Sequence, residues 1–183
     1  MKGRGQRAKG RGLRAKGCAA VLLLLSAAVA AAETLDRVLA VVAGQLIMLS
    51  DVNAARELGI VNVRPDSPDP TAEVLARLID RELMLVEVDR YAPTEPDPAT
   101  IDRDVAAVRD RFPSEKAFND VLRRSGYDLE HVREIVRQNL RLRAYLDERF
   151  ATTDDQRRRQ TLIDDWLAGL RRRTPAVNLY KSK

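Results

Sequence analysis

Residues 71–91 carry apolar side chains at helical spacing, and this pattern constrains the fold more than any other part of the chain. Two neighbouring lines of apolar residues, about 100° apart on the helix, contain Val74, Leu78 and Leu85 and, on the second line, Leu75, Ile79 and Val86. Leu83 widens this apolar sector. A helix that is apolar over so wide a sector packs against neighbours on two sides. The spacing therefore predicts a central helix within a mostly helical domain.

The rest of the chain contains further helical segments with recognisable ends. Ser50, Asp97 and Asp128 are residue types that accept hydrogen bonds from the first turn of a helix, and Pro98 suits the first helical position. Gly126 is a natural stop. Besides residues 71–91, we predict helices over residues 50–58, 98–111, 114–126, 128–150 and 154–173.

Two short runs rich in Val, Ile and Leu, residues 35–42 and 45–49, flank Ala43-Gly44. Because glycine adopts the backbone angles of tight turns, these runs predict a β-hairpin. Residues 176–180 form a third β-prone run, which we expect to pair with the hairpin and join the two ends of the chain. The predicted fold class is mostly α, a single helical domain with a small antiparallel sheet.

The N-terminus combines a basic segment with an apolar run. Residues 1–17 hold seven Lys and Arg residues and no acidic residue, and residues 18–32 are small and apolar. This order, closing on Ala30-Ala31-Ala32, predicts a secretory signal peptide over residues 1–32 that is cleaved to leave residues 33–183. An uncleaved anchor is the alternative, although the apolar run is short for a bilayer that needs about 20 residues.

The charge of the chain divides at the same point. The whole chain has a net charge of +5, whereas residues 33–183 carry 25 basic and 27 acidic residues, a net charge of −2. Because the basic excess belongs to the predicted signal, we expect no nucleic-acid partner for the mature chain.

Few side chains are available for catalysis or metal binding. The chain has one Cys, one His and none of the motifs G-x-S-x-G, H-E-x-x-H and C-x-x-C, so we expect no catalytic residue, metal or cofactor. His131 lies at the polar border of its helix, where we expect a solvated or capping role. We interpret four charge clusters as helix-terminal or solvated residues: Asp154-Asp155, Asp164-Asp165, Arg157–Arg159 and Arg171–Arg173.

Several Met and aromatic residues are candidates for contacts with an apolar peptide, because these side chains adapt to varied partners. The alternative for each of them is ordinary packing in the core. The candidate peptide-binding residues are Met48, Met84, Tyr91, Phe112, Phe118 and Tyr127.

The order of these elements resembles the N-terminal domain of SurA-type periplasmic chaperones. The segment DRVLAVVAGQLIMLSDV is similar to the family's opening AVVN-G-x-I-LxS-D-V pattern, with Ala43 in place of the usual Asn; the matching residues are Val41, Val42, Gly44, Ile47, Ser50, Asp51 and Val52. The later segments that resemble the helices and closing strand of that domain are residues 75–91, 97–112, 118–146 and 165–180.

The resemblance has one clear departure. SurA proteins carry one or two parvulin prolyl-isomerase domains after the long helix, whereas here Phe150 is followed almost at once by the last helix. The resemblance therefore implies a chaperone domain of the SurA/trigger-factor peptide-binding type over residues 33–183, closed by residues 154–180 and lacking the isomerase.

From this resemblance we expect an exported, periplasmic, ATP-independent chaperone-like protein that binds unfolded or nascent envelope polypeptides, including outer-membrane proteins. We expect no catalysis and, after cleavage, no membrane anchor. A dedicated periplasmic adaptor for one folded partner and a weak prolyl isomerase are the alternatives. The sequence leaves the oligomeric state open.

Overall fold

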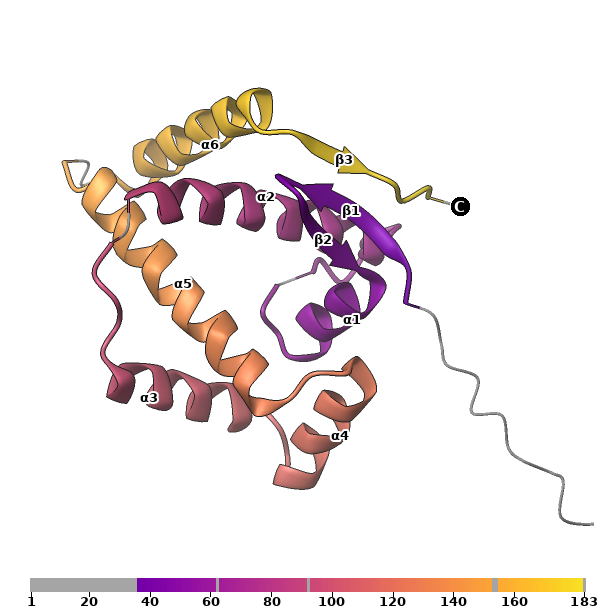
Figure 1. Ribbon diagram of the computed structural model, residues 1–183. Coiled ribbons are helices and arrows are strands. Elements are labelled where there is room, and N and C mark those ends of the chain that lie inside the picture. Colours follow the sequence, from indigo (N-terminus) through magenta and orange to yellow (C-terminus); the bar gives the residue numbers. More distant parts are fainter. Residues whose placement is uncertain (1–35, 62, 92, 153–154, 183) are drawn as a thin grey trace, which may run out of the picture. The chain divides into compact units, whose positions relative to one another are not determined.

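The structure, a computed structural model, describes residues 36–61, 63–91, 93–152 and 155–182. The predicted signal peptide lies outside the described residues. Asp36–Lys183 form one compact unit, in which the described residues make six helices and three strands (Figure 1). The predicted fold class, mostly helical with a small antiparallel sheet, is confirmed.

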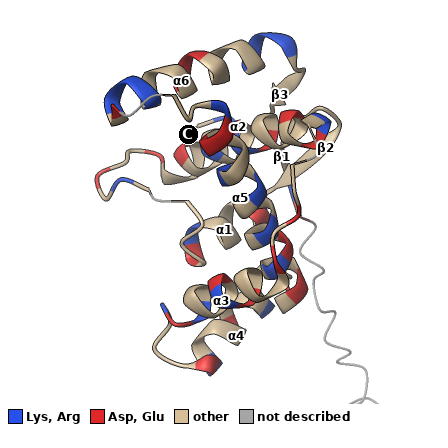
Figure 2. Cartoon of the chain, turned by 90° about the vertical axis from the view of Figure 1, so that its left-hand side faces the viewer, with Lys and Arg blue, Asp and Glu red and all other residues tan. Residues whose placement is uncertain are grey.

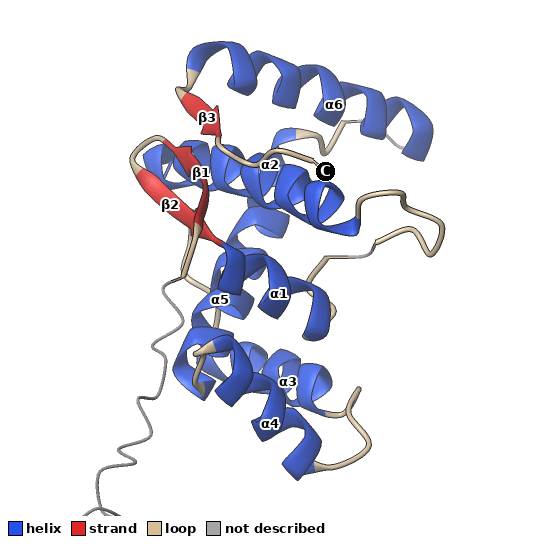
Figure 3. Ribbon diagram, turned by 90° about the vertical axis from the view of Figure 1, so that its right-hand side faces the viewer, coloured by secondary structure: helices blue, strands red, loops and turns tan. Residues whose placement is uncertain are grey.

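The sheet joins the two ends of this unit. Its strands are β1 (Val38–Val42), β2 (Gln45–Met48) and β3 (Ala176–Asn178), in the order β2-β1-β3 with both pairings antiparallel (Figure 3). Ala43 and Gly44 form the two-residue turn with φ angles of 50° and 91°, the left-handed backbone that such hairpins require. Both the hairpin and the pairing of the closing strand with it are confirmed.

The predicted helices are present, with boundaries close to those expected. They are α1 (Leu49–Glu57), α2 (Pro70–Tyr91), α3 (Pro98–Arg109), α4 (Glu115–Ser125), α5 (Leu129–Arg149) and α6 (Gln156–Arg173). Asp128 caps α5 by accepting the His131 backbone N–H (2.8 Å), and Gly126 ends α4 with a φ of 70°. α2 is central as predicted, because it contacts β1, β2, α1, α5 and α6.

The start of α1 differs from the prediction. The N-cap is Met48 rather than Ser50, because the Asp51 carboxylate reaches back and accepts the Met48 backbone N–H (2.7 Å). This contact satisfies a donor that the first turn of a helix leaves unpaired. The Ser50 hydroxyl instead donates to the carboxylate of Asp36, just before β1.

The buried side chains of the described residues form two clusters. One lies among the sheet, α2 and α6 and includes Leu39, Ala40, Val42, Leu75, Leu83 and Leu170. The other lies among α1, α3, α4 and α5 and includes Ala54, Leu58, Ile101, Phe118, Val132 and Val136. α5 links the two clusters, because its Tyr145 belongs to the first and its Val132 and Val136 to the second (Figure 1).

Charged residues of both signs alternate over the helices (Figure 2). On α6, Arg171 forms two hydrogen bonds to Asp80 of α2, of 2.8 and 2.6 Å, so part of the C-terminal arginine triplet ties two helices together. None of the helices in the described segments is both long and apolar enough to cross a membrane.

Candidate functional site

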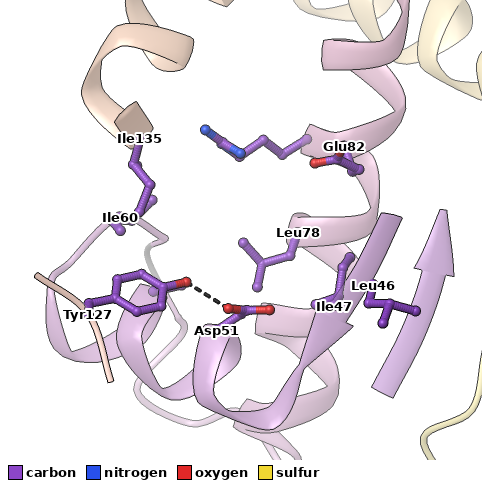
Figure 4. A pocket seen from close by; sticks show the side chains of 10 residues that line it. Leu46, Ile47, Asp51, Ile60, Leu78, Glu82, Tyr127 and Ile135 are labelled. Carbon is purple, nitrogen blue, oxygen red and sulfur yellow. Dashed lines mark hydrogen bonds between the residues drawn. The ribbon is translucent and has the colours of Figure 1, made fainter. Parts of the chain in front are cut away.

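A cleft lies where β2 meets α1, α2 and α5, and it consists of two adjoining pockets. The first, called here the apolar pocket, has a volume of about 120 Å³ (Figure 4). Its walls carry six aliphatic side chains from several elements: Leu46, Ile47, Ala55, Ile60, Leu78 and Ile135. The second, the charged pocket, has a volume of about 380 Å³ and shares Leu46 and Glu82 with the first.

One side of the apolar pocket is formed by a tyrosine–carboxylate contact. The Tyr127 hydroxyl donates to Asp51 Oδ1 (2.7 Å), as Figure 4 shows, and the Tyr127 ring stacks on the imidazole of His131 with 5.2 Å between centroids. Burial and the hydrogen bond to Asp51 raise the pKa of Tyr127. The phenol therefore stays a proton donor at neutral pH and holds the start of α1 against the segment that leads into α5.

The wall contributed by α2 brings two charges into the cleft. Arg81 donates from Nε to Asn139 Oδ1 (3.0 Å) and from Nη2 to Gln138 Oε1 (2.8 Å) on α5. Burial lowers the pKa of Arg81, and it raises the pKa of the neighbouring Glu82. Among the described residues, the Glu82 side chain takes part in no hydrogen bond or ion pair, and burial outweighs the attraction of Arg81, which acts to lower its pKa. The charge of Glu82 is therefore only partly compensated.

The other charges of the charged pocket are engaged with one another. Arg137 contacts Glu134 (Nη2–Oε1, 2.7 Å) and Glu95 (Nη1–Oε2, 2.8 Å), and the hydrogen bond from Arg137 lowers the pKa of Glu134. Arg141 Nη1 lies 2.8 Å from Asp89 Oδ1. Because both guanidinium groups already have carboxylate partners, Glu82 is the carboxylate at this end of the cleft that has no ion-pair partner among the described residues.

The six candidate peptide-binding residues do not converge on one place. Tyr127 lines the apolar pocket, whereas Met84 packs against the cluster under the sheet and Met48 is the half-buried cap of α1. Phe112 and Phe118 contact each other in the second cluster, with 5.4 Å between ring centroids.

Tyr91 is the last residue of α2 and lines neither pocket. It is 60% exposed and contacts the buried Tyr145 ring at 5.5 Å. Of the six candidates, therefore, only Tyr127 shares a site with the aliphatic walls of the cleft.

The charged residues that we interpreted as capping or solvated lie at helix ends and on helix surfaces. The capping role of His131 is confirmed, since its Nδ1 lies 2.7 Å from Asp128 Oδ1 at the start of α5. Asp155 caps α6 by accepting the Arg157 backbone N–H (2.8 Å). Asp154 lies outside the described residues, and Asp164 accepts a hydrogen bond from Gln160 one turn earlier (2.8 Å).

Arg81 and Glu82 are the functional candidates that sequence reasoning missed. A signal for Glu82 was present, because position 82 continues the line of Val74, Leu78 and Leu85 and breaks it with a carboxylate. A charge within an apolar stripe of a central helix is costly unless it faces a cavity or a partner. Arg81 carries no comparable sequence signal.

In the part of the chain that the structure describes, no three His, Cys, Asp or Glu side chains are placed to hold a metal ion. The cleft thus combines aliphatic walls, a fixed phenol and one carboxylate, Glu82, that is only partly compensated. No protein-family model and no curated protein sequence matches this chain.

Proposed function

We propose that this chain is an exported, ATP-independent chaperone-like protein of the SurA type, which binds unfolded or partly folded envelope polypeptides in the periplasm without catalysis. The proposed binding site is the cleft between β2, α1, α2 and α5. The observation that carries the proposal is the set of aliphatic side chains that line a pocket left open by the described residues.

The size and chemistry of the apolar pocket suit weak and unselective binding. Its volume of about 120 Å³ is somewhat smaller than the ~150 Å³ cavity that takes up benzene in another protein, so it accommodates about one aliphatic side chain. Burying one such side chain contributes roughly 2 kcal/mol. Aliphatic contacts are non-directional, so many client sequences could use the site, and weak binding would allow release without ATP.

The arrangement of the elements also supports the proposal. The hairpin leads directly into α1, and the last strand returns to pair with β1, which is the order that the resemblance to the SurA N-terminal domain implies. Periplasmic location is the part of the proposal that rests on residues 1–32, whose basic and apolar segments fit a secretory signal.

A light-scattering assay of an unfolded outer-membrane protein diluted from urea tests this function. We expect the purified chain, in severalfold molar excess, to suppress aggregation. Leu46→Asp should weaken the suppression because Leu46 lines both pockets and, at 57% exposed, tolerates a polar side chain without unfolding. Leu129→Asp is the matched control, because Leu129 is 49% exposed and lies outside the pockets.

The possible outcomes separate the proposal from its alternatives. Absence of suppression together with absence of peptide binding would contradict the chaperone function. A pull-down that returns one stoichiometric folded protein, rather than many unfolded ones, would favour a dedicated adaptor. Acceleration of proline isomerisation in a test peptide would favour the weak isomerase.

A further inference from the structure

The outer edge of β2 offers one residue whose backbone groups point away from the sheet. Leu39 accepts the Leu179 backbone N–H (2.8 Å) and Ala43 donates to the Pro175 carbonyl (2.9 Å), both toward the β3 side of β1. The backbone N–H and C=O groups of successive residues in a strand point to alternate sides. Val41 lies two residues from both Leu39 and Ala43, so its N–H and C=O groups also point toward β3. Leu46 stands opposite Val41 in the register, so its N–H and C=O are not used by β1 and face outward.

The cleft borders this same edge. Consecutive residues of a strand point to opposite faces of the sheet, yet Leu46 and Ile47 both line the apolar pocket, and Gln45 and Leu46 both line the charged pocket. Pockets that touch neighbouring residues in this way lie along the side of the strand rather than on one face. A chain paired with the Leu46 backbone would therefore run beside both pockets.

The charge of the cleft favours a cation at the junction of the pockets. The lining of the charged pocket includes the carboxylates of Glu82, Asp89 and Glu134 against two guanidinium groups, those of Arg137 and Arg141. Both guanidinium groups also contact Glu95 (2.8 and 3.2 Å). On the α2 side, Arg81 lines the apolar pocket and its charge partly offsets that of Glu82, while its Nε and Nη2 atoms donate hydrogen bonds to Asn139 and Gln138.

The position of Glu82 adds a geometric reason. Its carboxylate lines both pockets and has no ion-pair partner among the described residues. Glu82 is half-buried, so solvent screens its charge less than that of an exposed carboxylate. Its attraction to a cationic ligand is therefore stronger.

We infer that the cleft binds an extended polypeptide segment as an added strand on the Leu46 edge, with an aliphatic side chain in the apolar pocket and a neighbouring lysine or arginine side chain against Glu82. This inference rests on the proposed function and names the class of segment that the site prefers. Side chains two residues apart in an extended segment lie on the same side, about 7 Å apart, which suits two adjoining pockets. Main-chain bonds supply affinity in such strand addition, and the pockets supply selectivity.

Fluorescence anisotropy with labelled ten-residue peptides tests the inference on the purified full chain. One peptide carries leucine and, two residues later, lysine in a Ser/Thr background; its partner carries acetyl-lysine, which has the same stem without the charge. We expect the lysine peptide to bind about fivefold more tightly, equivalent to about 1 kcal/mol. Methylation of successive backbone nitrogens should weaken binding at every second residue, as strand pairing requires.

Glu82→Gln removes the charge while keeping the shape of the side chain. It should abolish the preference of the chain for the lysine peptide over the acetyl-lysine peptide, and residual binding of the acetyl-lysine peptide would show that the cleft is intact. Glu148→Gln, an exposed change on α5 outside both pockets, should keep the fivefold preference.

The results that overturn the inference differ from those that overturn the proposed function. Equal binding of the two peptides by the native chain, a preference that survives in Glu82→Gln, or a methylation pattern without a period of two would each overturn the inference while leaving the chaperone function standing. Binding of neither peptide would overturn the inference, and it would overturn the proposed function as well if the chain also failed to suppress aggregation.

Discussion

The hydroxyl of Tyr127 donates a 2.7 Å hydrogen bond to Asp51 Oδ1, across 76 positions of the chain. The other oxygen of the same carboxylate accepts the Met48 backbone N–H (2.7 Å). One carboxylate therefore caps α1 and fixes a side of the apolar pocket. The stability of α1 and the shape of the pocket are linked through this group.

Tyr127→Phe should lower the free energy of unfolding by about 1 kcal/mol, because it removes the hydrogen bond and leaves one oxygen of Asp51 without this donor. Urea unfolding followed by circular dichroism measures the change. Tyr91→Phe is the control; Tyr91 is 60% exposed, and the change should stay within about 0.5 kcal/mol. Equal effects of the two substitutions would contradict a special role for the Tyr127 contact.

The attachment of α6 depends on a few buried side chains. Leu170 is 1% exposed within the cluster under the sheet, so Leu170→Ala should destabilise the fold by roughly 2 to 4 kcal/mol through lost burial and the cavity left behind. Leu162→Ala on the same helix, where Leu162 is 38% exposed, should cost about 1 kcal/mol or less. Thermal and urea unfolding of both variants give the comparison, and similar losses would show that α6 is not anchored through Leu170.

Replacement of two glycines by alanine should change the free energy of unfolding differently. Gly126 has a φ of 70°, so Gly126→Ala should destabilise the fold by about 1 kcal/mol through left-handed backbone strain, although space for the methyl group is open. Gly169 lies within α6, and an added Cβ would meet only the far ends of two long side chains, Arg173 at 3.3 Å and Arg172 at 3.8 Å. Gly169→Ala should therefore be neutral or stabilising by up to about 1 kcal/mol. A urea midpoint that falls in both variants would contradict this prediction.

The free energy of unfolding should depend on the protonation of Glu82. Burial raises the pKa of Glu82 in the folded chain, so the folded state holds this proton more tightly than the unfolded state. The contribution of Glu82 to stability is greatest below the unfolded pKa and declines as the pH rises through the folded pKa.

Glu82→Gln should consequently raise the free energy of unfolding at pH 7. The native chain and the variant should converge below about pH 4, where Glu82 is protonated in both states. Urea unfolding at the two pH values tests this, with Glu148→Gln as the exposed control. A Gln variant less stable at pH 7 would mean that Glu82 is compensated within the fold.

Local sequence signals were sufficient for most of the secondary structure. Pro98, Asp128 and Gly126 mark helix ends through contacts within one turn, which a sequence displays directly. The start of α1 was predicted wrongly because two neighbouring residues, Ser50 and Asp51, can both cap a helix. The Asp51 carboxylate makes the capping contact, and the helix therefore begins earlier than Ser50 would indicate. The contact of Ser50 with Asp36, 14 positions earlier, is decided by the hairpin and not by the helix.

Sequence patterns predicted the residues of the candidate site much less well than they predicted the secondary structure. Met and aromatic residues were reasonable candidates, but the fold places Phe118 in the core and leaves Tyr91 outside both pockets. Whether an apolar residue lines a pocket depends on which elements fail to cover it, and that is a property of packing between distant segments.

The sequence by itself determined the mostly helical fold class, the central position of α2 and the strand that closes the sheet, because apolar spacing and turn residues act over a few positions. Only the tertiary structure decided that Leu46 faces outward on the open edge of β2 and that Glu82 lies between two pockets. Arg81 contacts Gln138 and Asn139 across 57 and 58 positions. Contacts of that range depend on how α2 and α5 pack together, which no local pattern encodes.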